Sequence, residues 1–157
     1  MPKVHDLPAY FQPLESLALM DVHLVSADLA PLADLRTLRT LELVDVPRAE
    51  RLPPLDRLRK LEELTITRCP VADLSPLECL DRLRELSLRD TPVADLGPVA
   101  SLSGLRRLDL RGTAVTDLAP VFALRQLEIV CLRGLRIPTD QLNTLRRANP
   151  RLEFDPY

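Results

Sequence analysis

The stretch Leu105–Leu124 reads LRRLDLRGTAVTDLAPVFAL, and two earlier stretches of the chain closely match it. Leu83–Leu102 reads LRELSLRDTPVADLGPVASL, and Leu61–Leu80 reads LEELTITRCPVADLSPLECL. Successive copies begin 22 residues apart. A fixed period of roughly 20 to 50 residues is typical of solenoids and other repeat architectures, so each copy is predicted to be one structural unit.

The period extends over most of the 157 residues, and two residue classes mark it independently. The leucines that open the units are Leu14, Leu38, Leu61, Leu83, Leu105 and Leu127, at intervals of 22 to 24 residues. The prolines that recur later in the units are Pro31, Pro54, Pro76, Pro98 and Pro120, at intervals of 22 or 23 residues. The sequence therefore predicts six repeats, with the bounds 14–37, 38–60, 61–82, 83–104, 105–126 and 127–137.

Each unit opens with L-x-x-L-x-L, in which Leu108 and Leu110 stand at alternate positions. This alternation predicts a short strand with one buried face. One such strand cannot bury a core alone, so the stacked units are predicted to form a parallel sheet over a shared leucine core. The motif T-x-V-x-D-L then turns the chain, and only about ten residues remain for the return. That length favours a 3₁₀ segment or a short helix.

An aspartate recurs just before the return segment, at Asp28, Asp73, Asp95 and Asp117. The column could be a functional acidic ladder or a set of local caps on exposed backbone N–H groups. A proline follows three positions later, where the first turn of a helix tolerates its missing N–H. This position at a turn favours the caps.

The pattern L-x-x-L-x-L-x-x-[TC]-x-V-x-D-L-x-P-[LV]-x-x-L, found in three successive units, resembles the leucine-rich-repeat family. The resemblance is to its short 22-residue class, which occurs in bacterial internalin-like proteins, and it covers Leu14 to Phe154. It implies an α/β fold: a leucine-rich-repeat solenoid with a curved parallel β-sheet on the concave face and 3₁₀ or short helical segments on the convex face. The family usually has Asn at the ninth position, where this chain has Val22, Val46, Cys69, Thr91, Thr113 and Leu135. We therefore expect a ladder of side-chain bonds that is weak in the middle and absent at both ends.

The two ends of the chain depart from the pattern, as terminal capping repeats do. Residues 1–13 are predicted to form a degenerate half-repeat that acts as the N-terminal cap. Residues 138–157 are predicted to form a capping helix and a last strand. The helix is expected to begin with Thr139 or Asp140 as its cap and to run to about Ala148. Caps and repeats together predict one domain.

The composition limits the possible classes of function. A formal net charge of −2 argues against a strongly basic nucleic-acid binder. The chain has neither a run of eighteen apolar residues nor a recognisable secretory signal, so we expect a cytoplasmic protein without a membrane-spanning helix.

The sequence contains no catalytic constellation. His5 and His23 are the only histidines, and neither a glycine-rich phosphate loop nor a pair of metal ligands occurs. We therefore expect no enzyme activity, no cofactor and no metal. Of the three cysteines, Cys69 and Cys79 are interpreted as structural, whereas Cys131 stands at an outward strand position and is expected to present its thiol to solvent.

The resemblance implies that partners dock on the concave face of the sheet, which the second, third, fifth, seventh and eighth positions of each unit would form. In repeats one to three these positions carry six acidic and two basic residues, a net charge of −4. In repeats four to six they carry four acidic and six basic residues, a net charge of +2. The concave face is therefore predicted to be acidic in its N-terminal half and basic in its C-terminal half.

The seventh position is more specific, because Arg89, Arg111 and Arg133 would stand in a row about 4.8 Å apart. The row could bind an acidic segment or a phosphate, since arginine suits bidentate recognition of such groups. Alternatively, it is a solvated row relieved by Asp90 and Asp109. If the row binds a partner, Arg111→Glu is expected to weaken binding and to leave thermal stability nearly unchanged. The predicted binding residues are Arg84, Glu85, Arg89, Asp90, Arg106, Arg107, Asp109, Arg111, Cys131 and Arg133.

These features predict a monomeric, non-enzymatic protein–protein interaction module whose partner is another protein. A partner with an acidic segment would suit the arginine row. An alternative is a regulatory or recognition subunit for a separate catalytic chain of the phosphatase, GTPase or ubiquitin-ligase type. Binding of a phosphate or nucleic acid through the arginine row is a third, less favoured alternative.

Overall fold

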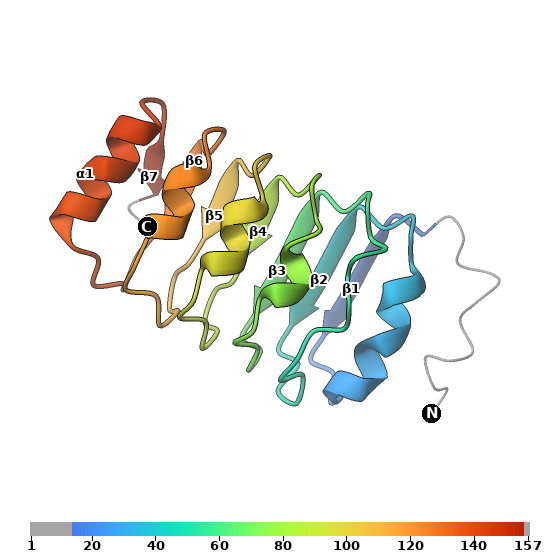
Figure 1. Ribbon diagram of the computed structural model, residues 1–157. Coiled ribbons are helices and arrows are strands. Elements are labelled where there is room, and N and C mark those ends of the chain that lie inside the picture. The colour runs from blue at the N-terminus through green and yellow to red at the C-terminus, as the bar shows by residue number, and fades with distance from the viewer. Residues whose placement is uncertain (1–13, 156–157) are drawn as a thin grey trace.

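The computed structural model describes residues 14–155, so the predicted N-terminal cap at 1–13 lies outside the described residues. Within these residues, seven parallel strands form one sheet in sequence order, as predicted (Figure 1). They are β1 (Ser16–Met20), β2 (Thr40–Val44), β3 (Glu63–Thr67), β4 (Glu85–Ser87), β5 (Arg107–Asp109), β6 (Ile129–Cys131) and β7 (Glu153–Asp155). The register follows the sequence period, with Leu108 opposite both Leu86 and Val130.

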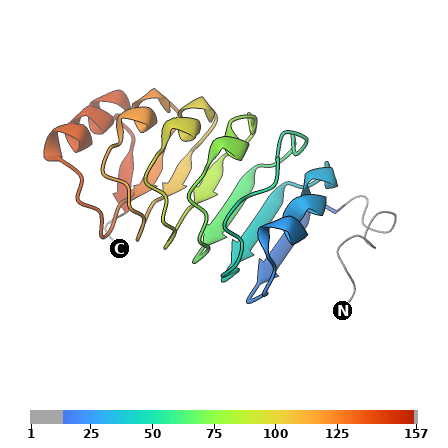
Figure 2. The same ribbon diagram turned by 60° about the horizontal axis from the view of Figure 1, so that its bottom comes forward.

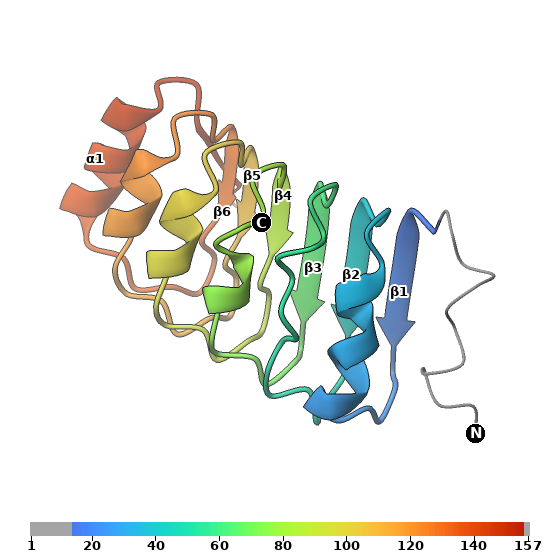
Figure 3. The same cartoon turned by 45° about the vertical axis from the view of Figure 1, so that its right-hand side comes forward.

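Helical segments cover the other side of the curved sheet (Figures 2 and 3). The 3₁₀ segments are η2 (Ser26–Asp34), η3 (Ser75–Leu77), η4 (Gly97–Ser101) and η5 (Ala119–Ala123). This alternation of parallel strands and 3₁₀ turns confirms the predicted solenoid. No helix in residues 14–155 is both long enough and apolar enough to cross a membrane.

The second repeat is an exception, because no helical segment lies between β2 and β3, a stretch that the structure describes completely. Two consecutive prolines, Pro53 and Pro54, occupy the return segment there. In repeats three to five the residue at the position of Pro53 donates its backbone N–H to the aspartate two residues earlier. Pro53 has no N–H to donate, and Arg51 stands where those repeats have the aspartate. The expectation of a helical return in every repeat is therefore wrong at this one position.

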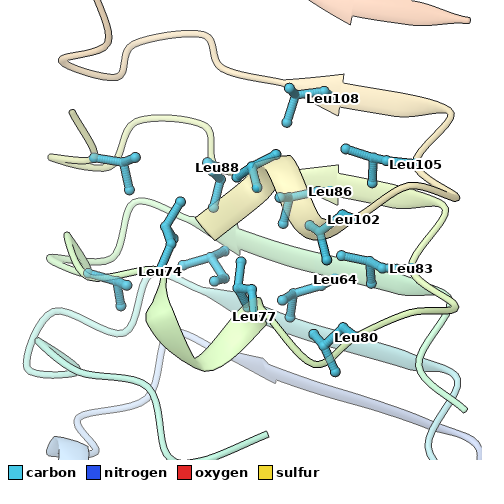
Figure 4. Packing of buried hydrophobic residues seen from close by; sticks show 14 of the residues in the cluster. Leu64, Leu74, Leu77, Leu80, Leu83, Leu86, Leu88, Leu102, Leu105 and Leu108 are labelled. Atoms are coloured by element: carbon cyan, nitrogen blue, oxygen red, sulfur yellow. The ribbon is translucent and has the colours of Figure 1, made fainter. Parts of the chain in front are cut away.

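The core is a continuous stack of leucines between the sheet and the helical segments (Figure 4). The four recurring aspartates act as local caps, as predicted, although Asp28 lies inside the first turn of η2 rather than before it. Asp73, Asp95 and Asp117 each accept a hydrogen bond from the backbone N–H two residues later, and Asp28 accepts one from Val25. The bonds from Ser75 lower the pKa of Asp73 below its ordinary value. These carboxylates therefore stabilise the turns and do not form a separate acidic site.

The ninth position does not form the expected ladder. Thr91 and Thr113 donate their hydroxyls to carbonyl oxygens three residues earlier, at 2.6 and 2.7 Å, so each bond stays within its own repeat. Cys69 alone reaches the preceding repeat, where its thiol lies 3.5 Å from the Leu43 carbonyl. Burial raises the pKa of the Cys69 thiol and keeps it protonated, as a donor needs to be.

The eighth position carries a turn constraint that the sequence did not reveal. Every residue in it has a positive φ, from 51° at Arg68 to 85° at Gly134. The column comprises Asp21, Asp45, Arg68, Asp90, Gly112 and Gly134. Glycine enters this left-handed region without a steric penalty, and aspartate enters it more readily than most residues. The column is therefore restricted by the backbone as well as exposed on the concave edge.

We expect Gly112→Ala to lower the free energy of unfolding by about 2 kcal/mol, measured by urea denaturation. Gly112 has a φ of 69°, and a Cβ there would stand 2.1 Å from an Asp90 carboxylate oxygen. The matched control is Gly134→Ala, where φ is 85° and nothing lies within 4 Å of the added Cβ. The control is expected to lose about 1 kcal/mol, for the backbone conformation alone. Equal losses would mean that contact with Asp90 has no effect.

The C-terminal end closes with α1 (Thr139–Ala148) and β7. The residue before the helix is Pro138, and neither Thr139 nor Asp140 caps it, so the expected cap is wrong. The fixed φ of proline already suits the start of a helix. Instead, side chains link α1 to the stack: Gln141 accepts a hydrogen bond from the Leu118 N–H at 2.7 Å, and Leu145 is fully buried.

Candidate functional site

The concave face is crossed by ion pairs that join neighbouring repeats. At the second position, Arg39 lies between two carboxylates, 2.6 Å from Glu62 and 3.7 Å from Glu15. Farther along the same column, Arg106 lies 3.5 Å from Glu128. Part of the charge that the sequence assigns to two opposite halves is therefore neutralised within the face itself.

A second pair joins the eighth positions of repeats two and three. The Arg68 guanidinium binds both carboxylate oxygens of Asp45, with Nε 2.6 Å from Oδ1. This hydrogen bonding lowers the pKa of Asp45 and raises that of Arg68. Both side chains are partly exposed, so the pair contributes little to stability and chiefly fixes where the two charges stand.

The three arginines of the seventh position are not equivalent. Arg111 is held by Asp109, whose carboxylate accepts bonds from its Nε at 3.0 Å, its Nη2 at 2.6 Å and its backbone N–H at 3.0 Å. Asp109 is only 8% exposed, so this pair is part of the structure of the sheet. Arg89 lies 3.2 Å from the exposed Asp90, and Arg133 is exposed and forms no ion pair with a described residue. Arg111 is therefore already bound within the chain.

Cys131 is buried, with no exposed surface, and the expectation of a solvent-facing thiol is wrong. Its strand position does place it on the concave face, opposite Asp109 and Asp155. However, β5 and β7 flank its strand on both sides, so its short side chain lies between two strands. A buried thiol of this kind is a structural residue.

Four of the predicted binding residues lie together at the N-terminal ends of the strands. Arg84, Glu85, Arg106 and Arg107 line a shallow hollow of about 320 Å³, together with Glu62, Glu63, Glu128 and Ile129. A second hollow of about 280 Å³ adjoins it and shares Arg84 and Arg106, with Arg82, Gly104 and Gln126 on its far side. The last three were not predicted, because they stand in the loops before the strands. The remaining predicted residues, at the C-terminal ends of the strands, do not line these hollows.

Residues with catalytic or metal-binding chemistry are scattered. His23 lies exposed in the loop after β1, and Cys79 is exposed beyond η3. Within residues 14–155, no group of three or more His, Cys, Asp or Glu residues is arranged to hold a metal ion.

No protein-family model and no curated protein matches the chain. Solved structures do match it. Internalin C2 of Listeria monocytogenes aligns with a TM-score of 0.77 and 26% identity over 92% of this chain and 62% of its own. Another internalin of the same species aligns with a TM-score of 0.66 and 20% identity over 92% of this chain and 47% of its own.

A chain of the Toll–Spätzle complex of Drosophila aligns with a TM-score of 0.62 and 18% identity over 79% of this chain and 17% of its own. The chain thus spans about half the length of the two internalins and a much smaller part of the Drosophila chain. The matched architecture leads to one conclusion: the chain is a leucine-rich-repeat protein by its fold, and its solenoid resembles those of the Listeria internalins.

Proposed function

We propose that the chain is a protein–protein interaction module that docks a partner protein on its concave face. The main support is the hollowed, charged surface that crosses β3 to β6 at the N-terminal ends of the strands. The leucine stack behind the sheet holds these side chains on a rigid frame, which lowers the entropic cost of binding. The Toll–Spätzle complex offers an example of the same architecture in a complex with another protein.

The chemistry of the face favours binding led by charge. None of the five outward positions in repeats one to six carries an aromatic residue, although aromatic side chains are common binding hot spots. Charge complementarity mainly accelerates association and selects the partner, so the affinity is expected to be modest and to fall as salt is added.

Site-specific photo-crosslinking in cells of the source organism tests this proposal. A photoreactive residue at Glu85, on the concave face, is expected to capture a partner protein, and the same residue at Glu78 is expected to capture none. The two positions are matched, because both are exposed glutamates in neighbouring repeats and Glu78 lies on the convex side after η3. Capture at Glu78 without capture at Glu85 would contradict docking on the concave face.

A further inference from the structure

Two pairs of like charges stand side by side on the concave face. Arg84 and Arg106 occupy the second position of adjacent repeats, and the N–H of Arg106 donates to the carbonyl of Arg84 at 2.8 Å. Glu63 and Glu85 occupy the third position, directly opposite each other on β3 and β4. Like charges opposite one another on adjacent strands destabilise a sheet. Elsewhere in the second column Arg39 lies between two glutamates, so the neighbours Arg84 and Arg106 depart from the alternation of charge in that column.

The described part of the chain neutralises the arginine pair only in part and the glutamate pair not at all. Arg84, Glu63 and Glu85 have no ion pair within 4 Å among the described residues, and Arg106 has only Glu128, at 3.5 Å. Arg107 stands opposite Glu85 in the register but forms no ion pair with it.

Two carboxylates that line the smaller hollow are bound by arginines other than Arg84 and Arg106. Glu62 lies 2.6 Å from Arg39, and Asp81 lies 3.5 Å from Arg59. Both carboxylates line the smaller hollow beside Arg84 and Arg106. Arg82, which also lines it, has no ion pair with a described residue. Two guanidinium groups of the smaller hollow, those of Arg82 and Arg84, therefore have no ion pair with a described residue, whereas Glu63 and Glu85 line only the larger hollow.

We infer that this surface recognises a peptide segment of a partner protein that carries an acidic side chain beside a basic one. The acidic side chain binds Arg84 and Arg106, and the basic side chain binds Glu63 and Glu85. Each contact replaces a like-charge neighbour with an opposite charge, and two adjacent contacts of opposite sign fix the direction of the segment. The inference rests on the proposed function. It places the centre of the binding surface at the two like-charge pairs and not at the row of Arg89, Arg111 and Arg133.

Nuclear magnetic resonance titration with synthetic peptides tests the inference. The probes are an octapeptide of alternating Glu and Lys and an octapeptide of Glu alone, both with blocked ends, at about 0.02 M salt so that screening is weak. The alternating peptide is expected to shift the amide signals of Arg84, Arg106, Glu63 and Glu85. Its dissociation constant is expected to rise at least about fivefold in Arg84→Gln/Arg106→Gln and also in Glu63→Gln/Glu85→Gln, because each removes one set of contacts.

Arg89→Gln is the matched control and is expected to leave the dissociation constant within about twofold. Unaltered binding in either double variant, or signals centred on Arg89, Arg111 and Arg133, would overturn the inference. The all-Glu peptide could instead bind more tightly than the alternating peptide, and Glu63→Gln/Glu85→Gln could strengthen its binding further. That result would also overturn the inference, in favour of a purely acidic partner. Self-association that needs the same four residues would identify a second copy as the occupant, again against the inference. Crosslinking at Glu85 but not at Glu78, together with peptide binding that neither double variant alters, would support the proposed function and overturn this inference.

Discussion

Replacing Leu108 with alanine is expected to lower the free energy of unfolding by about 3 kcal/mol, measured by urea denaturation followed by circular dichroism. Leu108 has no exposed surface and stacks between Leu86 and Val130 in the register of β4, β5 and β6. Its side chain therefore fills a slot closed on both sides, and its removal leaves a cavity that the rigid neighbouring repeats cannot collapse to fill.

The same substitution at Leu17 is the matched control. Leu17 occupies the same position of the repeat in β1, but it is only partly buried, and within the described residues only β2 pairs with its strand. We expect Leu17→Ala to cost about 1 kcal/mol, because less apolar area returns to water and the surroundings can relax. A loss at Leu17 as large as that at Leu108 would contradict the view that each repeat is supported mainly by its neighbours.

Much of the fold could be predicted from the sequence because the same local requirement recurs in each unit. Leu105, Leu108 and Leu110 repeat since every strand has to fill the same slot in one core, and all three are fully buried. Asp95 and Asp117 repeat since every turn exposes the same backbone N–H groups. A unit that departs from the pattern does not hide the fold, because the other units still show the same period.

The site was harder to predict, because its charge depends on which residues of adjacent repeats the long side chains contact. Arg39 has acidic residues on both sides, and only the structure shows that it contacts Glu15 and Glu62. Arg111 and Arg133 share a column in the sequence, yet Asp109 is near enough to hold only Arg111. The burial of Cys131 likewise depends on its neighbours in β5 and β7 rather than on its own strand alternation.

Arg111→Glu, which the sequence suggested would leave stability nearly unchanged, is expected from the structure to lower the free energy of unfolding by about 3 kcal/mol. The Asp109 side chain is 12% exposed and that of Arg111 is 27% exposed, so the pair is largely removed from water. Replacement of the guanidinium by a carboxylate deprives Asp109 of its bonds to Nε and Nη2 and adds a like charge beside it. Thermal and urea unfolding of the variant measure the loss. A reduced affinity for any partner would then report damage to the sheet as well as a lost contact.

Arg89→Glu is the control that separates these effects, because it makes the same charge change at the same position of the adjacent repeat. Arg89 and its partner Asp90 are 49% and 44% exposed, and an exposed ion pair contributes at most about 1 kcal/mol. The control is therefore expected to lose less than about 1 kcal/mol. The double variant Asp109→Asn/Arg111→Gln is expected to recover part of the loss, since no buried charge is then left without a counterion. If Arg111→Glu and Arg89→Glu cost the same, Asp109 does not anchor Arg111, and the arginine row regains its place as a candidate binding surface.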